Sequence, residues 1–288
     1  MKILITGTSG RLGGALKRCY ESRHEILAPS HAELDLARPD GLETVLDDLE
    51  FDVLINCAGM VHPDACERDP LSAMQVNAES PAQLAGCCQH RGVRMIHIST
   101  DYVFDSVEAS PLDEAALAQP INAYGRSKLA GEQAVMAASS KALVARVSWL
   151  FGGHLPSFPE QMIKTALSGH EVAAIADKWS VPTSVDDVAH WLEHLVTQCP
   201  KASGILHVCN SGQATWHEYA ETTLSLAHEL GVIPDLPMVQ RQALDGFAGF
   251  IAKRARYTVM SNARLAGWMG QAPRTWQEAL RESLARGA

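Results

Sequence analysis

The stretch TGTSGRLG (residues 6–13) directly follows the apolar run KILIT and decides how the chain folds. It places Gly7, Gly10 and Gly13 between a predicted strand and a helix predicted to begin at Arg11. Glycine lets the backbone turn sharply and approach a pyrophosphate, which the free N–H groups at a helix N-terminus bind. A tight turn would explain one such glycine, whereas three in this position predict a dinucleotide-binding loop.

Apolar runs alternate with helical stretches through the first half of the chain. Further strands are predicted at residues 25–28, 52–58, 94–99 and 142–148. Helices are predicted near residues 11–21, 42–49, 70–91 and 122–138. These strands are apolar throughout, which is typical of a sheet that is covered on both faces. The sequence therefore predicts an α/β fold, a doubly wound parallel sheet of the Rossmann type.

This alternation weakens after Trp149, where Gly and Pro cluster in FGGHLPSFP. Later elements are a predicted strand at 171–176, helices near 185–197, 216–231 and 275–287, and the run GILHV (204–208). We expect GILHV to return to the sheet. Residues 1–149 with about 184–210 would then form the dinucleotide-binding domain. Residues of about 150–183 with 211–288 would form a smaller C-terminal substrate-binding lobe.

The composition excludes several classes of protein. The 288 residues are 47% hydrophobic and 20% charged, and a net charge of −9 argues against a nucleic-acid surface. The chain lacks an apolar run of 18 residues and enters a strand at its N-terminus, so we expect a cytoplasmic protein without membrane contact. Seven cysteines without a CxxC pair and twelve histidines without HExxH predict neither disulfides nor a zinc site. His97, within an apolar run, is interpreted as a core residue.

Two side chains in AYGRSKLAGE suit proton transfer. Tyr124 and Lys128 are four residues apart and so share one face of a predicted helix. An ammonium beside a phenol stabilises the phenolate and lowers its pKa from about 10 towards neutrality. The helix follows a strand that ends in Ser99, Thr100 and Asp101, and ligands bind beyond such strand ends. Thr100, Tyr124 and Lys128 are therefore the predicted catalytic residues for hydride addition to a ketone.

The residues after the second strand bear on the choice of cofactor. The spacing of the three glycines resembles that of short-chain dehydrogenases, which place an acid there to hold the ribose of NAD. Here residues 28–31 read Ala-Pro-Ser-His without an acid, and Arg11 lies in the glycine loop. We therefore favour NADP(H), with NAD(H) as the alternative, although Arg11 can equally be a solvated helix residue.

Six segments in chain order resemble dTDP-4-dehydrorhamnose reductases of the extended short-chain dehydrogenase/reductase (SDR) family. They are GTSGRLGGAL, STDYVFD, YGRSKLAGE, RVSWLFG, PTSVDDVA and SGQATWHEYA, and they span nearly the whole chain. STDYVFD together with YGxxKLxGE is specific to this group. The resemblance implies NAD(P)H-dependent reduction of the 4-keto group of a nucleotide-linked 6-deoxysugar, as in dTDP-rhamnose biosynthesis. Its catalytic trio falls on Thr100, Tyr124 and Lys128.

The motifs and the resemblance together indicate the binding residues. Those expected to bind the cofactor are Gly7, Ser9, Gly10, Arg11, Leu12, Gly13, Asp35, Leu36, Cys57, Ala58, Gly59, Ser99, Tyr124 and Lys128. Those expected to contact a nucleotide-sugar substrate are Val61, Thr100, Tyr102, Tyr124 and Trp149. Some family members dimerise through a metal held by glutamates, but Ala15 stands at one of those positions, so we predict no metal site. A homodimer stays open.

Three segments depart from the family pattern, namely CAGMVHPDACE, Ser157-Phe158 and RARYTVMSN. All would border the sugar nucleotide, so the sugar and the base stay open. Tyr102 replaces the acid that sugar-nucleotide dehydratases carry, which argues against dehydration. A similar scaffold serves as the regulatory subunit of methionine adenosyltransferase, in which the dinucleotide is structural. That binding role, and the reduction of a different ketone, are the alternatives.

Overall fold

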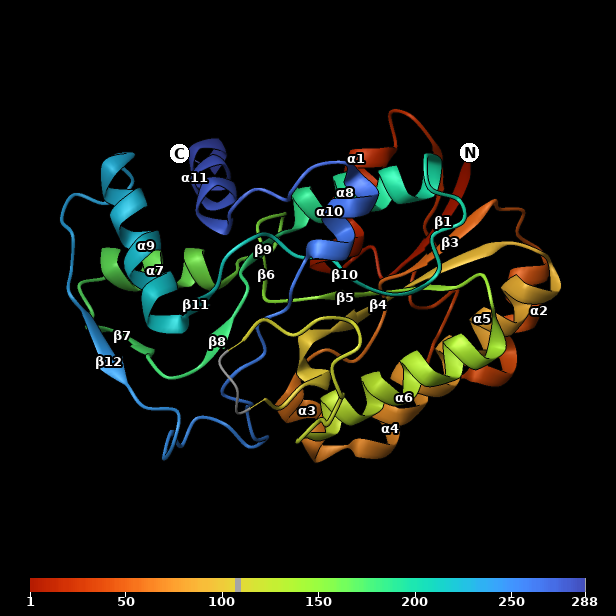
Figure 1. Ribbon diagram of the computed structural model, residues 1–288, viewed down its shortest axis with the longest axis horizontal. Helices are drawn as coiled ribbons and strands as arrows, with labels where there is room; N and C mark the ends of the chain where they lie inside the picture. The colour runs from red at the N-terminus through yellow and green to blue at the C-terminus, as the bar shows by residue number, and fades with distance from the viewer. Residues whose placement is uncertain (107–109, 288) are drawn as a thin grey trace.

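Six parallel strands form the central sheet in a computed structural model of the chain, which describes residues 1–106 and 110–287 (Figure 1). In sheet order the strands are β10 (Gly204–His207), β5 (Leu143–Val147), β4 (Arg94–Thr100), β3 (Val53–Asn56), β1 (Lys2–Thr6) and β2 (Glu25–Leu27). The doubly wound sheet and the return of residues 204–207 to it are thus confirmed. β1 lies between β2 and β3: after β1 the chain forms β2 on one side of it and then crosses to form β3 on the other side. The switch point where such sheets bind ligands therefore lies between β1 and β3.

Helices cover both faces of this sheet (Figure 1). One face carries α1 (Arg11–Tyr20), α8 (Val185–Thr197) and α10 (Ala263–Met269). The other carries α2 (Leu42–Asp47), α5 (Ser80–His90) and α6 (Ala123–Ala138), with the short η1 (Pro39–Gly41) preceding α2. Neighbouring residues of β1 enter opposite cores, since Ile3 packs with Leu16 of α1 and Leu4 packs with Leu46 of α2. Burial of both faces explains why the strands are apolar throughout.

The single helix expected over residues 70–91 is interrupted. It consists of α4 (Pro70–Met74), the π-helical segment η2 (Gln75–Glu79) and α5. Asn77 of the π segment accepts a hydrogen bond from the Met60 N–H (2.8 Å) and donates to the Met60 carbonyl (2.9 Å) and to Ser127 Oγ (3.0 Å). The π turn, a feature common at functional sites, thus fixes the loop after β3 against α6.

A second group of elements, several of them short, lies beside the central sheet (Figure 1). Its helices are α7 (Phe158–Leu167), α9 (Trp216–Glu229) and α11 (Trp276–Gly287). Its strands pair as β7 (Val172–Ile175) with β12 (Val239–Gln242), β8 (Trp179–Ser180) with β11 (Ala214–Thr215), and β6 (Leu150–Phe151) with β9 (Thr183–Ser184). The sequence did not predict α7, α10, β12 or α3 (Pro63–Arg68). For α7 a signal was present, because Glu160 accepts from the Ser157 N–H (2.6 Å) in a Ser-x-x-Glu capping pattern.

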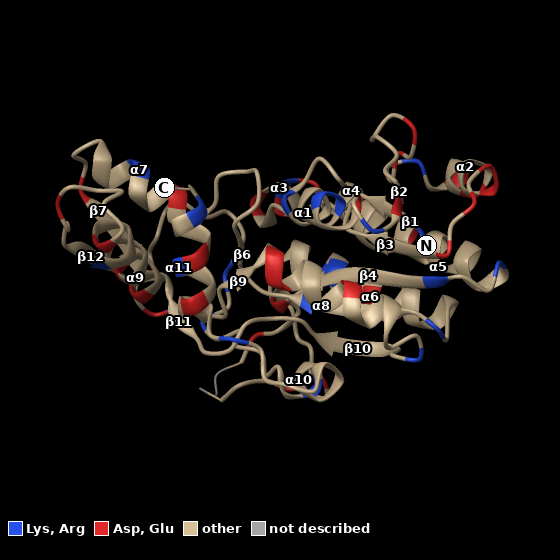
Figure 2. Cartoon of the chain, turned by 90° about the horizontal axis from the view of Figure 1, so that it is seen from above, with Lys and Arg blue, Asp and Glu red and all other residues tan. Residues whose placement is uncertain are grey.

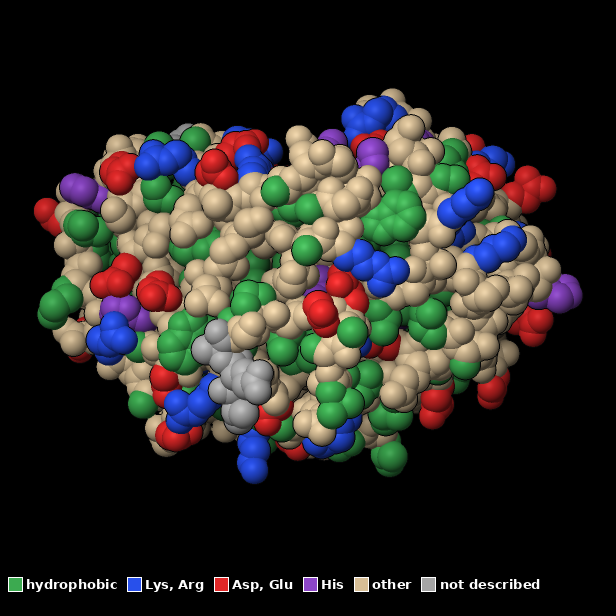
Figure 3. All heavy atoms as spheres, viewed as in Figure 1, with side chains coloured by type: hydrophobic (Ala, Val, Ile, Leu, Met, Phe, Trp, Pro, Cys, Tyr) green, Lys and Arg blue, Asp and Glu red, His purple; other side chains and the backbone are tan. Residues whose placement is uncertain are grey.

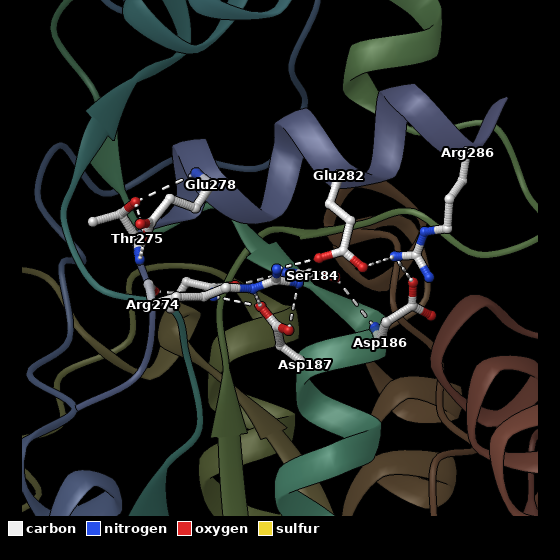
Figure 4. A network of polar contacts seen from close by, with 9 residues as sticks. Ser184, Asp186, Asp187, Arg274, Thr275, Glu278, Glu282 and Arg286 are labelled. Atoms are coloured by element: carbon white, nitrogen blue, oxygen red, sulfur yellow. Dashed lines mark hydrogen bonds and ion pairs between the residues drawn. The ribbon is translucent and has the colours of Figure 1, made fainter. Parts of the chain in front are cut away.

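A network of ion pairs joins α11 to the start of α8 (Figure 4). Arg274 donates to both carboxylate oxygens of Asp187 (2.9 and 2.8 Å) and also pairs with Glu282. Arg286 donates to Asp186 (2.7 Å). The last helix is therefore attached to the sheet-forming part of the chain by side chains from both of its ends.

Charged side chains of both signs are mixed over the central sheet layer and the second group of elements (Figure 2), and acidic, basic and apolar groups alternate on the face seen in Figure 3. Within residues 1–106 and 110–287, no helix combines the length and apolarity that crossing a membrane requires. Over the same residues, no group of three or more His, Cys, Asp or Glu side chains is placed to hold a metal ion.

Candidate active site

A cavity of about 1300 Å³ runs along the carboxyl ends of β1, β3, β4 and β5 and reaches the start of α7. Nearly all the predicted site residues line it: Gly7, Ser9, Gly10, Arg11, Leu12, Gly13, Leu36, Cys57, Ala58, Gly59, Val61, Ser99, Thr100, Tyr102, Tyr124, Lys128 and Trp149. Asp35 is the exception and does not line the cavity. Its carboxylate accepts from the Ala37 N–H (2.9 Å) and lies near His31 and Arg38, so it serves the turn that contains it.

The glycine loop forms a cradle at one end of the cavity. Gly7 has φ +69°, and a Cβ there would lie 2.7 Å from the Ala58 nitrogen. A Cβ on Gly13 would lie 2.4 Å from the Gly7 carbonyl oxygen. Gly10 is the N-cap of α1 and has no side chain to bond the first N–H groups of that helix. The glycines thus let the loop pack closely against residues 57 and 58, and the free donors at the start of α1 fit a pyrophosphate.

The Arg11 side chain lines the cavity but bonds the protein backbone in this structure. Its guanidinium donates to the carbonyl oxygens of Gly152 (2.8 Å), Leu155 (2.6 Å) and Pro156 (2.7 Å). Arg11 therefore holds the loop between β6 and α7, and it gives no reason to favour NADP(H) over NAD(H).

Other side chains lie where the adenosine part of a dinucleotide would bind. Lys17 of α1 and, beyond the end of β2, Ser30 and His31 line the cavity, whereas the nearby acids Glu33 and Asp35 do not. Lys17 and His31 are groups that can pair with a phosphate, and neither was singled out from the sequence. For His31 the signal was present, since it belongs to the segment 28–31 on which the NADP(H) argument relied.

The predicted catalytic trio meets at the centre of the cavity. Thr100 ends β4 and begins the 3-10 turn η3 (Asp101–Val103), while Tyr124 and Lys128 lie on α6. Thr100 and Tyr124 both line the cavity. Lys128 Nζ donates to the Ile98 carbonyl oxygen (2.6 Å). A hydroxyl, a phenol and an ammonium thus border one space, although all three side chains are buried.

Burial dominates the ionisation of these groups. It raises the pKa of Tyr124 above the usual value for a phenol, and the Thr100 hydroxyl only partly offsets this effect. Burial also lowers the pKa of Lys128 to about 8. The expected lowering of the Tyr124 pKa by the ammonium is therefore not what this structure shows. Tyr124 is a protonated phenol at neutral pH, which is the form that donates a proton.

His97 lies directly beneath Lys128, a contact that its interpretation as a core residue did not include. Thr6 Oγ1 accepts from the Ala58 N–H (3.2 Å), so its own hydrogen goes to Asn56 Oδ1 (2.6 Å). The Asn56 amide nitrogen then donates to His97 Nδ1 (3.0 Å). His97 Nε2 lies 3.4 Å from Lys128 Nζ. Burial keeps the His97 pKa well below its usual value, so the ring stays neutral.

Ser99 contacts a buried ion pair behind the cavity wall. Its hydroxyl donates to Glu132 (2.5 Å), and the Glu132 carboxylate accepts two hydrogen bonds from Arg146 (2.9 and 2.6 Å). The hydroxyl is thus engaged with the protein interior, and this residue can act on a ligand mainly through its backbone.

Aromatic side chains form the wall opposite the glycine loop. The Tyr102 and Tyr124 rings meet edge to face with centroids 5.4 Å apart. The Trp149 backbone has φ +40°, a conformation that residues other than glycine rarely adopt. Its ring packs against those of Phe158 and Trp216, with centroids 5.3 and 5.5 Å away. Such strain costs about 1–3 kcal/mol and persists where packing over-determines the position. The sequence indicated Trp149 and placed Phe158 at the border of the sugar nucleotide, but it did not indicate that these two rings and Trp216 pack together.

Comparison with known proteins places this arrangement in context. The RmlD substrate binding domain matches residues 1–288. A probable dTDP-4,6-dihydroxy-2-methyloxan-3-one 4-ketoreductase of Streptomyces antibioticus is 36% identical over 288 residues, which cover 98% of this chain and 94% of that protein. A dTDP-4-dehydrorhamnose reductase of Burkholderia thailandensis is 33% identical over 78% of each chain.

A solved structure agrees with these sequence matches. The crystal structure of dTDP-4-dehydrorhamnose reductase from Bacillus anthracis in complex with NADP superposes with a TM-score of 0.90. It is 28% identical and covers 99% of each chain.

Proposed function

The chain belongs to the family of the RmlD substrate binding domain, and we propose that it reduces the 4-keto group of a dTDP-linked 6-deoxysugar with NAD(P)H. It is an oxidoreductase of the extended SDR type. The observation that carries the proposal is the convergence of Thr100, Tyr124 and Lys128 on one cavity that also contains the glycine cradle. NADPH is the expected cofactor, in keeping with the NADP bound by the similar protein of Bacillus anthracis.

The side chains support a simple division of labour. The cofactor, when bound, supplies the hydride that adds to the carbonyl carbon of the substrate. Tyr124, held as a neutral phenol by burial, donates its proton to the carbonyl oxygen. Thr100 would turn its hydroxyl hydrogen, which goes to Asp101 in this structure, to the same oxygen, and Lys128 would bind the ribose next to the nicotinamide. Together these groups would stabilise the charge that develops on the oxygen during reduction.

The remaining binding assignments are proposals of the same kind. The glycine loop, Leu36 and residues 57–59 would hold the dinucleotide, whereas Val61, Tyr102 and Trp149 would contact the sugar nucleotide. Residues 1–149 with about 184–210 would then be the cofactor domain, and about 150–183 with 211–288 the substrate lobe. A cytoplasmic location and a homodimer stay predictions.

The alternative of a regulatory subunit has less support. It needs the dinucleotide only as a structural element, and so gives no reason for a buried hydroxyl, phenol and ammonium around one cavity. The named relatives at 33% and 36% identity are reductases. Reduction of a different ketone remains the second candidate, because the two relatives differ in their named substrates.

Turnover with a defined substrate tests the proposal. Purified protein should oxidise NADPH in the presence of a dTDP-4-keto-6-deoxysugar, with product formation followed by mass spectrometry. Tyr124→Phe should lower kcat by more than about 100-fold, because general acid catalysis contributes roughly 10²–10⁴. Its dissociation constant for NADPH should change little.

Tyr257→Phe is the matched control, since the Tyr257 hydroxyl bonds Gln213 (2.9 Å) and the residue does not line the cavity. Wild-type protein that binds NADPH but reduces no 4-keto-6-deoxysugar would refute the proposal. A partner enzyme that copurifies stoichiometrically and functions equally well with Tyr124→Phe would support the regulatory alternative.

A further inference from the structure

A chain of buried hydrogen bonds runs from the second group of elements to the catalytic threonine. Lys178 Nζ donates to Ser180 Oγ (3.2 Å), and Ser180 Oγ is 3.0 Å from Thr258 Oγ1. Thr258 Oγ1 donates to Asp101 Oδ2 (2.7 Å). Asp101 Oδ1 in turn accepts from the Thr100 hydroxyl (3.2 Å). Lys178, which does not line the cavity, is thus connected to Thr100, which does.

The direction of these bonds follows from the number of hydrogens. Ser180 accepts from the ammonium and has one hydrogen to pass on, which points to Thr258. Thr258 likewise passes its hydrogen to Asp101. Every donor therefore points from the cation towards the carboxylate, an arrangement in which neighbouring hydrogen bonds strengthen one another.

Both charged ends of the chain are removed from water. Lys178 is 1% exposed and Asp101 is 3% exposed. Burial raises the pKa of Asp101, an effect that Lys178 and the bonded hydroxyls oppose, and burial lowers the pKa of Lys178 to about 8. A buried carboxylate is tolerated only with a compensating cation or enough donors. Lys178 is the compensating cation here. The donors are the hydroxyls of Thr258 and Ser148, the second of which lies 2.9 Å from Asp101 Oδ2.

The two oxygens of the Asp101 carboxylate have different hydrogen-bond partners. Oδ2 of Asp101 is occupied by Thr258 and Ser148, which leaves Oδ1 for Thr100. Thr100 Oγ1 also accepts from the Tyr102 N–H (3.2 Å). The rotation of a single hydroxyl at the reaction centre is therefore governed by the Asp101 carboxylate.

We propose that Lys178, Ser180 and Thr258 are positioning residues for the reduction, which hold the Asp101 carboxylate in place so that it orients the Thr100 hydroxyl. The inference rests on the proposed function. Lys178 precedes β8, Ser180 is its last residue, and Thr258 follows Tyr257, which bridges to Trp179 of β8. The chain therefore links the catalytic hydroxyl to residues that lie more than 75 positions away in the sequence.

Two substitutions at Thr258 separate the hydroxyl from the shape of the side chain. Thr258→Val keeps the volume and interrupts the chain, and we expect kcat to fall roughly 10-fold or more while the KM for NADPH stays unchanged. Thr258→Ser restores the hydroxyl and should recover kcat to within about 2-fold of wild type. Equal losses in both variants, or no loss with valine, would overturn the inference.

Thr223→Val is the matched control. Thr223 is a buried threonine of α9 whose hydroxyl has no hydrogen-bond partner in the described part of the chain. The same exchange there should leave kcat unchanged, because no polar chain is cut. A loss in this variant as large as that of Thr258→Val would mean that loosened packing in the second group of elements is responsible, and would also overturn the inference.

A double-mutant cycle tests the chain without relying on turnover. Lys178→Met and Thr258→Val should each lower Tm, and the double variant should lower it less than the sum, because both cut the same chain. Additive shifts would contradict the chain. Wild-type protein that reduces no keto sugar would refute the proposed function, and the Tm cycle would still decide whether the four side chains act together.

Discussion

Lys128 donates a hydrogen bond to the Ile98 carbonyl oxygen across 2.6 Å, and this contact holds a buried ammonium at the floor of the cavity. Burial lowers the pKa of Lys128 to about 8, below its value in the unfolded chain. The unfolded state therefore binds more protons between about pH 8 and pH 10, so the contribution of Lys128 to stability rises with pH over that window.

Lys128→Met should expose this dependence. We expect the free energy of unfolding of wild type, relative to the variant, to increase by on the order of 1–3 kcal/mol between about pH 7 and pH 10. Denaturant unfolding at several pH values measures it, and Lys178, which is present in both proteins, cancels from the comparison. A difference that stays constant with pH would show that burial does not lower the pKa of Lys128.

Gly13→Ala should damage the cradle. The added Cβ would lie 2.4 Å from the Gly7 carbonyl oxygen, so the backbone must shift, at a cost of about 1–3 kcal/mol. We expect a lower Tm and at least a roughly 10-fold weaker NADPH affinity, measured by fluorescence titration. Gly86→Ala in α5 is the control, because its Cβ would meet nothing within 4 Å. Equal behaviour of the two variants would argue against a tight glycine cradle.

Ser30→Asp should shift the cofactor preference towards NADH. A carboxylate next to Lys17 and His31 would repel a 2′-phosphate and accept from ribose hydroxyls, so kcat/KM for NADPH should fall about 10-fold or more. Arg11→Met is the contrasting variant. It removes three bonds to the 152–156 loop and should lower Tm, yet keep the ratio of NADPH to NADH activity. A changed ratio in Arg11→Met would show that this arginine does influence the choice between NADPH and NADH.

Arg274→Met should loosen the last helix. Arg274 bonds both Asp187 oxygens and pairs with Glu282 while one-third exposed, so we expect a loss of about 1 kcal/mol in the free energy of unfolding (Figure 4). Arg256→Met is the control, because its pairs with Asp177 and Asp245 are more exposed and should contribute less. The prediction is wrong if the two variants unfold at the same denaturant concentration.

The sheet was predictable because its physical cause is local. Strands buried on both faces need uninterrupted apolar residues, and this pattern is visible in KILIT and in residues 142–148 without knowledge of their neighbours. The convergence of Thr100, Tyr124 and Lys128 followed from the rule that ligand-binding residues gather at the carboxyl ends of parallel strands.

Features that depend on distant partners were not predictable. Thr258 reaches Asp101 across 157 residues of sequence, and Arg11 finds its carbonyl partners more than 140 residues away. Nothing local marks such contacts, because a single threonine or arginine has the same pattern whether it is solvated or buried. The pKa of Tyr124 was misjudged for the same reason, since burial by the whole fold outweighs one nearby ammonium.

The position of β10 at the edge of the sheet, beside β5, has a consequence for synthesis on the ribosome. More than fifty residues separate the two strands, so the hydrogen-bonding edge of β5 stays open while they are translated. Unpaired strand edges invite association with other chains. Nascent or prematurely terminated chains that stop before Gly204 are thus the species on which chaperones would be needed most.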